Sequence, residues 1–239
     1  MPPKISRRQA LLVIVAGGAG VGFVIASSRL TSLLNPPPVA QPLSLDSAVP
    51  MIISRSDWSA REPDHQAPNE FGFTTSPLNP QWYVYPGSLS DAYNTVVIHH
   101  SASLLSANET MADIQDSHMD VNGWADIAYH FGIDKDGLVY EGRDIGARGA
   151  SVAGFNTGTI GIVVMGNFEQ ESPLAVQMES LQDLVNALAS AYSLTHLAGH
   201  GEFNPESVCP GSHFIPRLDE LAQKAGLLRG TAGHVRPTA

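Results

Sequence analysis

The most informative segment of the chain reads TVVIHHS and covers residues 95–101. From Thr95 to Ile98 its side chains are β-branched and mostly apolar, which is the pattern of a strand that is covered on both faces. Two histidines, His99 and His100, follow at the point where this strand would end. We therefore take the end of this strand as the first place to look for chemistry.

The segments around this strand alternate between strand and helix patterns. Residues 159–165 are a second short apolar run suited to a central strand, and residues 128–133 and 138–141 flank a DKDG turn and predict a hairpin. Helical spacing followed by Gly123 predicts a helix over residues 111–122, and an apolar stripe at helical spacing predicts a second one over residues 181–192. Residues 215–228 are expected to form the last helix. The expected fold class is a single α/β domain with a mixed central β-sheet flanked by helices and a candidate site at the strand ends.

Composition limits the classes of function. The chain has 239 residues, of which 43% are hydrophobic and 15% charged, and it carries a formal net charge of −10. A protein that binds nucleic acid by neutralising phosphates normally has the opposite balance, so we expect no nucleic-acid partner. The single cysteine, Cys209, forms no disulfide within the chain, and its presence needs another explanation.

The N-terminal residues 1–28 have the layout of an export signal. Arg7 and Arg8 precede an apolar run over residues 10–26, a pattern that resembles a twin-arginine signal peptide. The alternative is a membrane anchor, because the run is close to the minimum length that spans a bilayer. We expect export to the cell envelope or beyond, and the sequence leaves open whether the signal is cleaved or kept as a membrane tether.

Three further segments complete the expected organisation of the chain. Residues 29–52 are rich in proline and have the composition of a linker. Residues 53–228 would form the folded domain, and residues 229–239 would form a flexible tail in which His234 is solvated.

His200 and Cys209 are the other candidates for chemistry. Neutral imidazole and thiolate are side chains that suit zinc, and both residues lie in a segment rich in glycine, proline and asparagine. Their spacing matches no common zinc motif, and a lone cysteine also fits the role of a small buried apolar residue, so spacing alone leaves both interpretations open. His196 is left out, because Gly199 and Gly201 disfavour the helix that would place it beside His200.

Short motifs distributed in a consistent order between residues 53 and 214 resemble one family. They are ISRSDWSA (53–60), VIHHS (97–101), WADIAYHF (124–131), DGLVYEGR (136–143), GFN (154–156), IGI (160–162), GNF (166–168), GH (199–200) and CPG (209–211). Together they resemble the N-acetylmuramoyl-L-alanine amidases of the peptidoglycan-recognition and phage-lysozyme type.

The resemblance implies a zinc site made of His99, His200 and Cys209. Three protein ligands leave one coordination position free, which is typical of catalytic rather than structural zinc. Tyr129 and Ser207 match positions whose side chains assist catalysis in the family. Both hydroxyls could donate a hydrogen bond to the oxyanion that forms during amide hydrolysis. For Tyr129 the alternative is an ordinary half-buried tyrosine on the hairpin strand.

The resemblance also implies a substrate. The enzyme would cut the bond between N-acetylmuramic acid and L-alanine in peptidoglycan or muropeptides, and the alternative is a module that binds peptidoglycan without hydrolysis.

Gly123, Trp124 and Arg143 match positions that favour a stem peptide with meso-diaminopimelate, and Asn156 matches a further substrate contact. A partly exposed Arg143 would pair with the additional carboxylate; otherwise Trp124 is a core aromatic residue and Arg143 a solvated charge. We expect a monomer.

The sequence departs from the family pattern in three places. The interval between His200 and Cys209 is one residue longer than expected, so the loop would have to bulge to keep both ligands on one metal. Gly201 replaces a polar or basic residue, and Ser151 replaces a histidine at the edge of the expected substrate site.

Overall fold

The computed structural model describes residues 51–67, 69, 85 and 87–235. Seven strands of this part of the chain form one sheet. They are β1 (Ile52–Ile53), β2 (Thr95–His100), β3 (Phe131–Ile133), β4 (Val139–Glu141), β5 (Thr159–Val164), β6 (His196–Gly199) and β7 (Leu228–Arg229).

The strand order across the sheet is β1-β4-β3-β5-β2-β6-β7. Only β3 and β4, which form the predicted hairpin, pair in antiparallel fashion, and all other neighbours are parallel. All six residues of β2 are buried between β5 and β6. The predicted mixed α/β sheet is therefore confirmed, and the TVVIHHS segment supplies one of its central strands.

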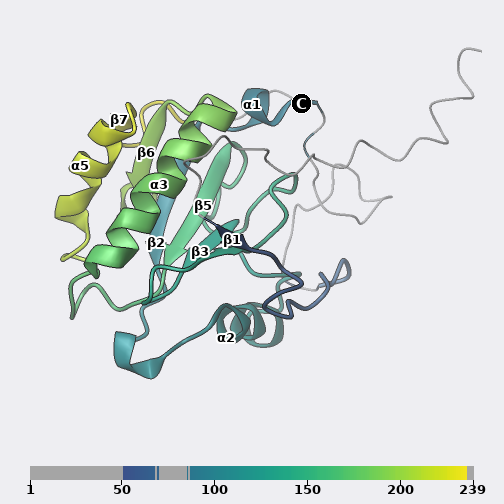
Figure 1. Ribbon diagram of the computed structural model, residues 1–239. Coiled ribbons are helices and arrows are strands. Elements are labelled where there is room, and N and C mark those ends of the chain that lie inside the picture. The colour runs from purple at the N-terminus through teal and green to yellow at the C-terminus, as the bar shows by residue number, and fades with distance from the viewer. Residues whose placement is uncertain (1–50, 68, 70–84, 86, 236–239) are drawn as a thin grey trace, which may run out of the picture. The chain divides into compact units, whose positions relative to one another are not determined.

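Helices cover both faces of this sheet. The regular helices are α1 (Leu89–Ala92), α2 (Met111–Asp116), α3 (Ala175–Tyr192), α4 (His200–Phe203) and α5 (Ile215–Lys224), with a short 3-10 turn, η1 (Leu105–Ala107), before α2. Helix α3 lies across β2 and β5, with α5 beside it next to β7, whereas α2 lies apart from both (Figure 1).

The two faces of the sheet bury cores of different size. The larger core joins α3 and α5 to alternate strand residues such as Ile98 and Ile162, whereas the smaller one joins Met111 of α2 to Val163. Because side chains alternate along a strand and His99 pairs with Val163 in the register, His99 belongs to the face of the smaller core. That face is where the candidate site lies.

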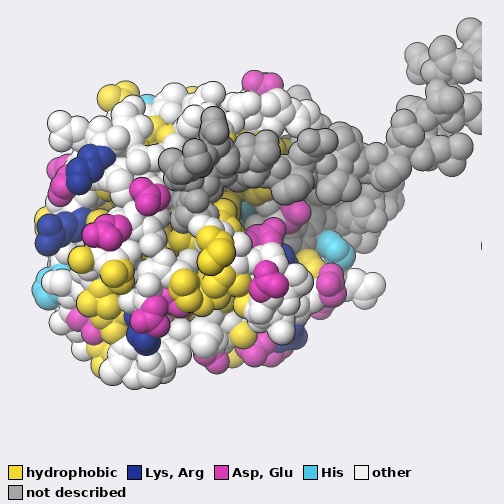
Figure 2. All heavy atoms as spheres, viewed as in Figure 1, with side chains coloured by type: hydrophobic (Ala, Val, Ile, Leu, Met, Phe, Trp, Pro, Cys, Tyr) yellow, Lys and Arg dark blue, Asp and Glu magenta, His cyan; other side chains and the backbone are white. Residues whose placement is uncertain are grey.

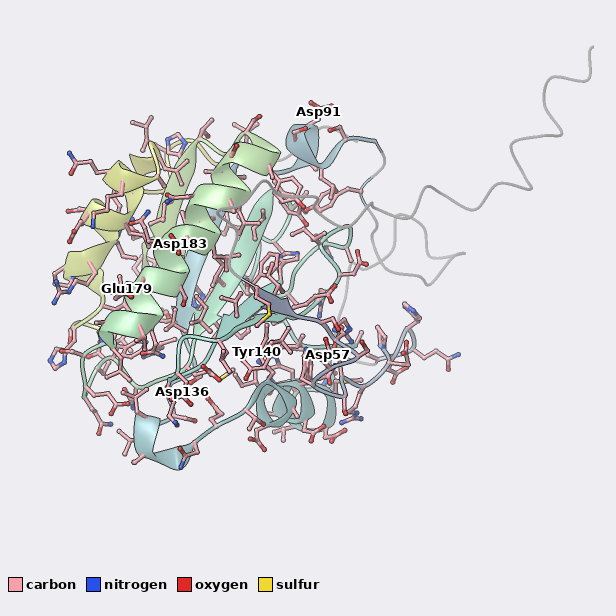
Figure 3. The ribbon with its side chains drawn as sticks, in the orientation of Figure 1. Asp57, Asp91, Asp136, Tyr140, Glu179 and Asp183 are labelled. Carbon is pink, nitrogen blue, oxygen red and sulfur yellow. The ribbon has the colours of Figure 1, made fainter. Side chains whose placement is uncertain are left out.

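Helix α3 illustrates how sequence pattern sets burial. Its predicted apolar stripe is buried, while Glu179 and Asp183, one turn apart, lie on the side that points away from the sheet (Figure 3). On the face shown in Figure 2, Asp and Glu side chains are spread over the surface, as the net charge of −10 leads one to expect.

Two predicted elements have different bounds in the structure. The helix expected over residues 111–122 is α-helical only to Asp116 and continues as a wider π-type turn, η2 (Ser117–Val121). The strand expected from Ala128 begins at Phe131 instead, and the N–H group of Ala128 donates to Nδ1 of His118 at 3.1 Å.

The C-terminal region differs more. Helix α5 ends at Lys224, and Leu228 starts the edge strand β7. Residues 229–235, expected to be part of a flexible tail, pack on the domain, where the N–H of Gly230 donates to the carbonyl of Leu197 at 2.8 Å. His234, expected to be solvated, is partly buried with its ring against aromatic side chains.

The expected export signal, residues 1–28, lies outside the described residues, as does nearly all of the expected linker. The linker prediction extends one residue into the first strand, since Ile52 pairs with Val139 in the sheet. Among the described residues, no helix combines the length and the apolar character needed to cross a bilayer.

Candidate metal centre

Three elements bring the predicted ligands together. His99 lies near the end of β2, His200 is the first residue of α4 directly after β6, and Cys209 lies in the loop before α5. Strands β2 and β6 are parallel neighbours in which Ile98 pairs with Gly199. The residues that follow this pair, His99 and His200, therefore lie at the same edge of the sheet. One ligand atom from each of the three side chains lies within 4.8 Å of the others.

His99 has the protonation state that a metal ligand needs. Its side chain is 1% exposed, and burial lowers its pKa well below the ordinary value, with the neighbouring His200, His100 and His118 rings acting in the same direction. Nδ1 lies 3.7 Å from Sγ of Cys209, while the buried Nε2 has no hydrogen-bond partner among the described residues. The imidazole is therefore neutral and has a lone pair to offer.

The thiol of Cys209 is also largely removed from solvent. Burial raises its pKa to about 12, and the backbone N–H of His100, 3.3 Å from Sγ, opposes this shift. A thiolate in such a site needs a positive charge beside it. Two neutral imidazoles and one thiolate are a donor set that suits Zn²⁺, so the residues present fit the expected metal.

Gly201 explains how the long loop between His200 and Cys209 closes. Its N–H donates to the carbonyl of Cys209 at 2.7 Å, and a Cβ atom at this position would lie 2.6 Å from the carbonyl oxygen of Ser207. The returning backbone therefore passes where any larger side chain would stand. Two departures from the family pattern, the additional residue and the glycine, thus have one structural cause.

Tyr129, one of the two residues predicted to supply a catalytic hydroxyl, lies beside the predicted ligand His99. Its ring centroid lies 5.0 Å from that of His99, and burial raises the pKa of its hydroxyl strongly, with the Cys209 and Glu109 charges adding to the effect. The hydroxyl is therefore protonated at neutral pH and remains a donor. Ser207 lies beside the cluster, where its Oγ accepts the N–H of Cys209 at 3.3 Å.

His118 is a member of this region that the sequence analysis placed only in a helix pattern. Its ring lies between those of Trp124 and Tyr129, with centroid distances of 4.9 and 5.5 Å. Burial, followed by the charge of Arg143, lowers its pKa to about 4. The π-type turn η2 carries it, and the signal available in the sequence was only a histidine five residues before Gly123.

The predicted substrate residues lie in irregular segments outside the helices and strands. Gly123 has φ of +67°, a conformation that favours glycine, and the N–H of the half-buried Trp124 donates to the carbonyl of His118 at 2.9 Å. Asn156 uses its Oδ1 to accept the N–H of Val152 at 2.7 Å and thereby closes its own loop.

The expectation that Arg143 is partly exposed is wrong. The residue is 0% exposed, and its guanidinium donates to the carbonyls of Ile127 at 2.8 Å, Arg148 at 3.1 Å and Asp126 at 3.2 Å. Backbone carbonyls therefore accept hydrogen bonds from this buried guanidinium. Arg143 therefore holds the segment before β3 in place, and its assignment to the substrate stays a prediction.

The fold and the site define a mixed α/β domain in which two histidines after adjacent parallel strands and a cysteine from a nearby loop form a cluster that could bind a metal ion. Within this class, the chain belongs to the Amidase_2 family, described as N-acetylmuramoyl-L-alanine amidase, which matches residues 90–212. The resemblance predicted from the motifs is thereby confirmed.

Three similar proteins place the chain within this family. Peptidoglycan-recognition protein LB of Drosophila melanogaster is 29% identical over 217 residues, which are 80% of this chain and 82% of that protein. The amidase LysCS, an endolysin from Clostridium intestinale, is 34% identical with a TM-score of 0.53, covering 61% of this chain and 91% of that one. Peptidoglycan recognition protein LE, solved with tracheal cytotoxin, a monomeric diaminopimelic acid-type peptidoglycan, is 27% identical with a TM-score of 0.55, covering 72% and 92%.

Proposed function

We propose that this protein is a zinc-dependent N-acetylmuramoyl-L-alanine amidase that hydrolyses the amide bond between N-acetylmuramic acid and L-alanine in peptidoglycan. Membership of the family supports a role on peptidoglycan, but the family neighbours include both amidases and recognition proteins. The observation that carries the enzymatic proposal is the cluster of His99, His200 and Cys209, in which two imidazoles and one thiol offer ligand atoms within 4.8 Å of one another. A module that only binds peptidoglycan has no need for such a set.

In this proposal each side chain has a distinct task. His99, His200 and Cys209 hold the metal, and their pKa shifts leave the imidazoles neutral at physiological pH. When bound, Zn²⁺ supplies a Lewis acid that polarises a carbonyl and makes water more acidic. Tyr129 keeps its proton, because burial raises its pKa, and donates a hydrogen bond to the oxygen on which negative charge develops as the amide carbonyl is attacked.

The preferred stem peptide would contain meso-diaminopimelate. Gly123 and Trp124 match the pattern associated with this type, and the related protein LE was solved with a diaminopimelic acid-type ligand. Asn156 would make a further contact with the substrate. Because Arg143 is engaged with backbone carbonyls, its share in this preference would come from shaping the Asp126–Ile127 segment.

The protein would act outside the cytoplasm as a monomer. Arg7 and Arg8, ahead of an apolar run, support export by the twin-arginine route, either with cleavage or with the signal retained as a tether. This route carries folded proteins, so Cys209 could receive its metal before it meets an oxidising exterior.

The test combines metal analysis with hydrolysis of two muropeptides that differ only in lysine or meso-diaminopimelate at the third position. We expect the purified wild type to hold zinc stoichiometrically and to cut the diaminopimelate form faster. Cys209→Ser should lose most of the metal and all activity, because a neutral hydroxyl replaces a thiolate poorly. The matched control is Val208→Ser, which makes a similar change at a neighbouring side chain that is 62% exposed.

Two results would contradict the proposal. Unchanged zinc content in Cys209→Ser would overturn the ligand set. Tight binding of muropeptides by a wild type that holds zinc but releases no products would identify a recognition module instead.

A further inference from the structure

We infer that the C-terminal segment of residues 228–235, named here the C-terminal strap, is a positioning element for α4, the one-turn helix that carries His200. The inference rests on the proposed metal role of His200. It goes beyond that role by assigning a task to residues that lie after the end of the family match at residue 212.

Arg229 of the strap connects three elements of the domain. Nη1 of its guanidinium forms an ion pair with the carboxylate of Glu202 in α4 and lies 3.2 Å from the carbonyl oxygen of Leu197 in β6. Nε lies 3.2 Å from Oδ1 of Asp219 in α5. The Arg229 side chain is 23% exposed and that of Glu202 36%, so the pair is partly shielded from solvent.

Glu202 transmits this contact to the metal ligand. Its Oε2 also accepts the backbone N–H of Gly199 at 2.6 Å, so the carboxylate bridges the residue before His200 and the strap. Helix α4 contains only four residues, and a single turn has almost no stability of its own. The direction of the His200 side chain therefore depends on contacts made from outside the helix.

The strap holds the other end of α4 through aromatic contacts. The ring of His234 lies 5.5 Å from that of Phe203, the last residue of α4, and 5.7 Å from that of Phe155. Gly233 lies so close to the ring of His196 that any Cβ atom at this position would overlap the imidazole. Arg229 acts near the start of α4 and His234 at its end, so the strap restrains the whole turn.

The first test uses Arg229→Ala, with Lys224→Ala as matched control. The control removes the same charge and breaks an exposed pair, Lys224 with Glu220, on α5. Zinc affinity is measured by competition with a chelator, and hydrogen exchange is followed over residues 199–203 in the metal-free protein. We expect Arg229→Ala to weaken zinc binding about tenfold and to speed exchange over residues 199–203 but not in α3. Arg229→Lys should restore part of the affinity, and Lys224→Ala should change neither quantity.

A second variant ends the chain after Arg229 and so removes the His234 contacts while keeping the ion pair. It should also speed exchange over residues 199–203, with a smaller loss of zinc affinity. Wild-type zinc affinity and wild-type exchange in both Arg229→Ala and the shortened chain would overturn the inference. If the wild type bound no zinc, the proposed function would fail, and the exchange data would still decide whether the strap orders α4.

Discussion

At the scale of single residues, burial controls the charge state of the candidate site. Desolvation is the largest cause of the pKa shifts of His99, His200, Cys209 and Tyr129, and it favours the neutral form of each. For the imidazoles and the tyrosine this neutral form is the one the proposed chemistry uses. For Cys209 it is not, so the thiol alone has to lose a proton when the metal binds.

Tyr129→Phe should keep the fold and the zinc content but lower turnover by about 10² to 10³, the usual cost of losing one donor to an oxyanion. The substitution removes a hydroxyl and almost no volume. The measurement is kcat on a muropeptide together with zinc content. Tyr140→Phe is the matched control, since that hydroxyl donates to Asp134 at 2.9 Å on the hairpin. Wild-type turnover in Tyr129→Phe would make Tyr129 a structural residue only.

His130 predicts acid sensitivity of the fold. Its side chain is 1% exposed, and burial lowers its pKa from 6.5 to about 4, while Nδ1 accepts the N–H of Gly161 at 3.1 Å. Between pH 6.5 and 4 the unfolded chain binds a proton here that the folded protein does not, so the free energy of unfolding falls as pH falls through this window. A shift of this size corresponds to about 3 kcal/mol.

Urea unfolding of the metal-free protein at several pH values measures this effect. His130→Gln should be less stable at pH 7 but should lose less stability than the wild type on acidification to pH 4.5. Other buried histidines, such as His118, contribute equally to both proteins, so the difference between the two slopes isolates His130. Parallel slopes would show that His130 is not the group responsible.

At the scale of elements, the loop from His200 to Cys209 decides whether two ligands from one segment can share a metal. The loop leaves the sheet through α4, returns past Gly201, and places Cys209 beside the N–H of His100. Its length is tolerated because one residue lacks a side chain at the point where the backbone returns. The path of this loop therefore determines where Cys209 lies relative to His200.

Gly201→Ala should weaken zinc binding about tenfold, because its Cβ would displace the Ser207 carbonyl and with it the Cys209 side chain. We expect a loss of about 1 to 3 kcal/mol in the free energy of unfolding, the usual cost of overpacking. Zinc competition and urea unfolding measure the two effects. Glu206→Ala, a change at an exposed position of the same loop, is the control. Equal zinc affinity in Gly201→Ala and the wild type would show that the loop accommodates the methyl group without moving Cys209.

At the scale of the whole molecule, the proposed location of the enzyme depends on a segment outside the described residues. The folded domain contains a single thiol, and that thiol belongs to the candidate metal centre. Export after folding would deliver it with its metal in place.

Replacing both Arg7 and Arg8 with lysine should leave the protein in the cytoplasm of a bacterium that has a twin-arginine pathway, because that pathway reads the arginine pair. Cell fractionation followed by immunodetection measures the distribution. Lys4→Ala, which removes a charge nearby but keeps the arginine pair, should be exported normally. Export of the double variant at the wild-type level would point to another route.

Local signals were sufficient for much of this architecture. The apolar run of residues 95–98 predicted a central strand, the DKDG turn predicted the β3–β4 hairpin, and the stripe from Leu181 to Tyr192 predicted most of α3. The motifs around His99, His200 and Cys209 were sufficient to recognise the family and to name the three residues that the fold brings together. All of these depend on residue type and spacing along the chain, which the sequence states directly.

Tertiary structure alone decided the features that depend on distant partners. Arg143 is buried because carbonyls of Asp126, Ile127 and Arg148 face its guanidinium, and residues 229–235 are ordered because β6 and α4 offer them partners. The place of His118 between two aromatic rings depends on the π-type turn η2. Such contacts leave no periodic pattern in the sequence, because each depends on backbone groups and side chains that come together only when the sheet has formed.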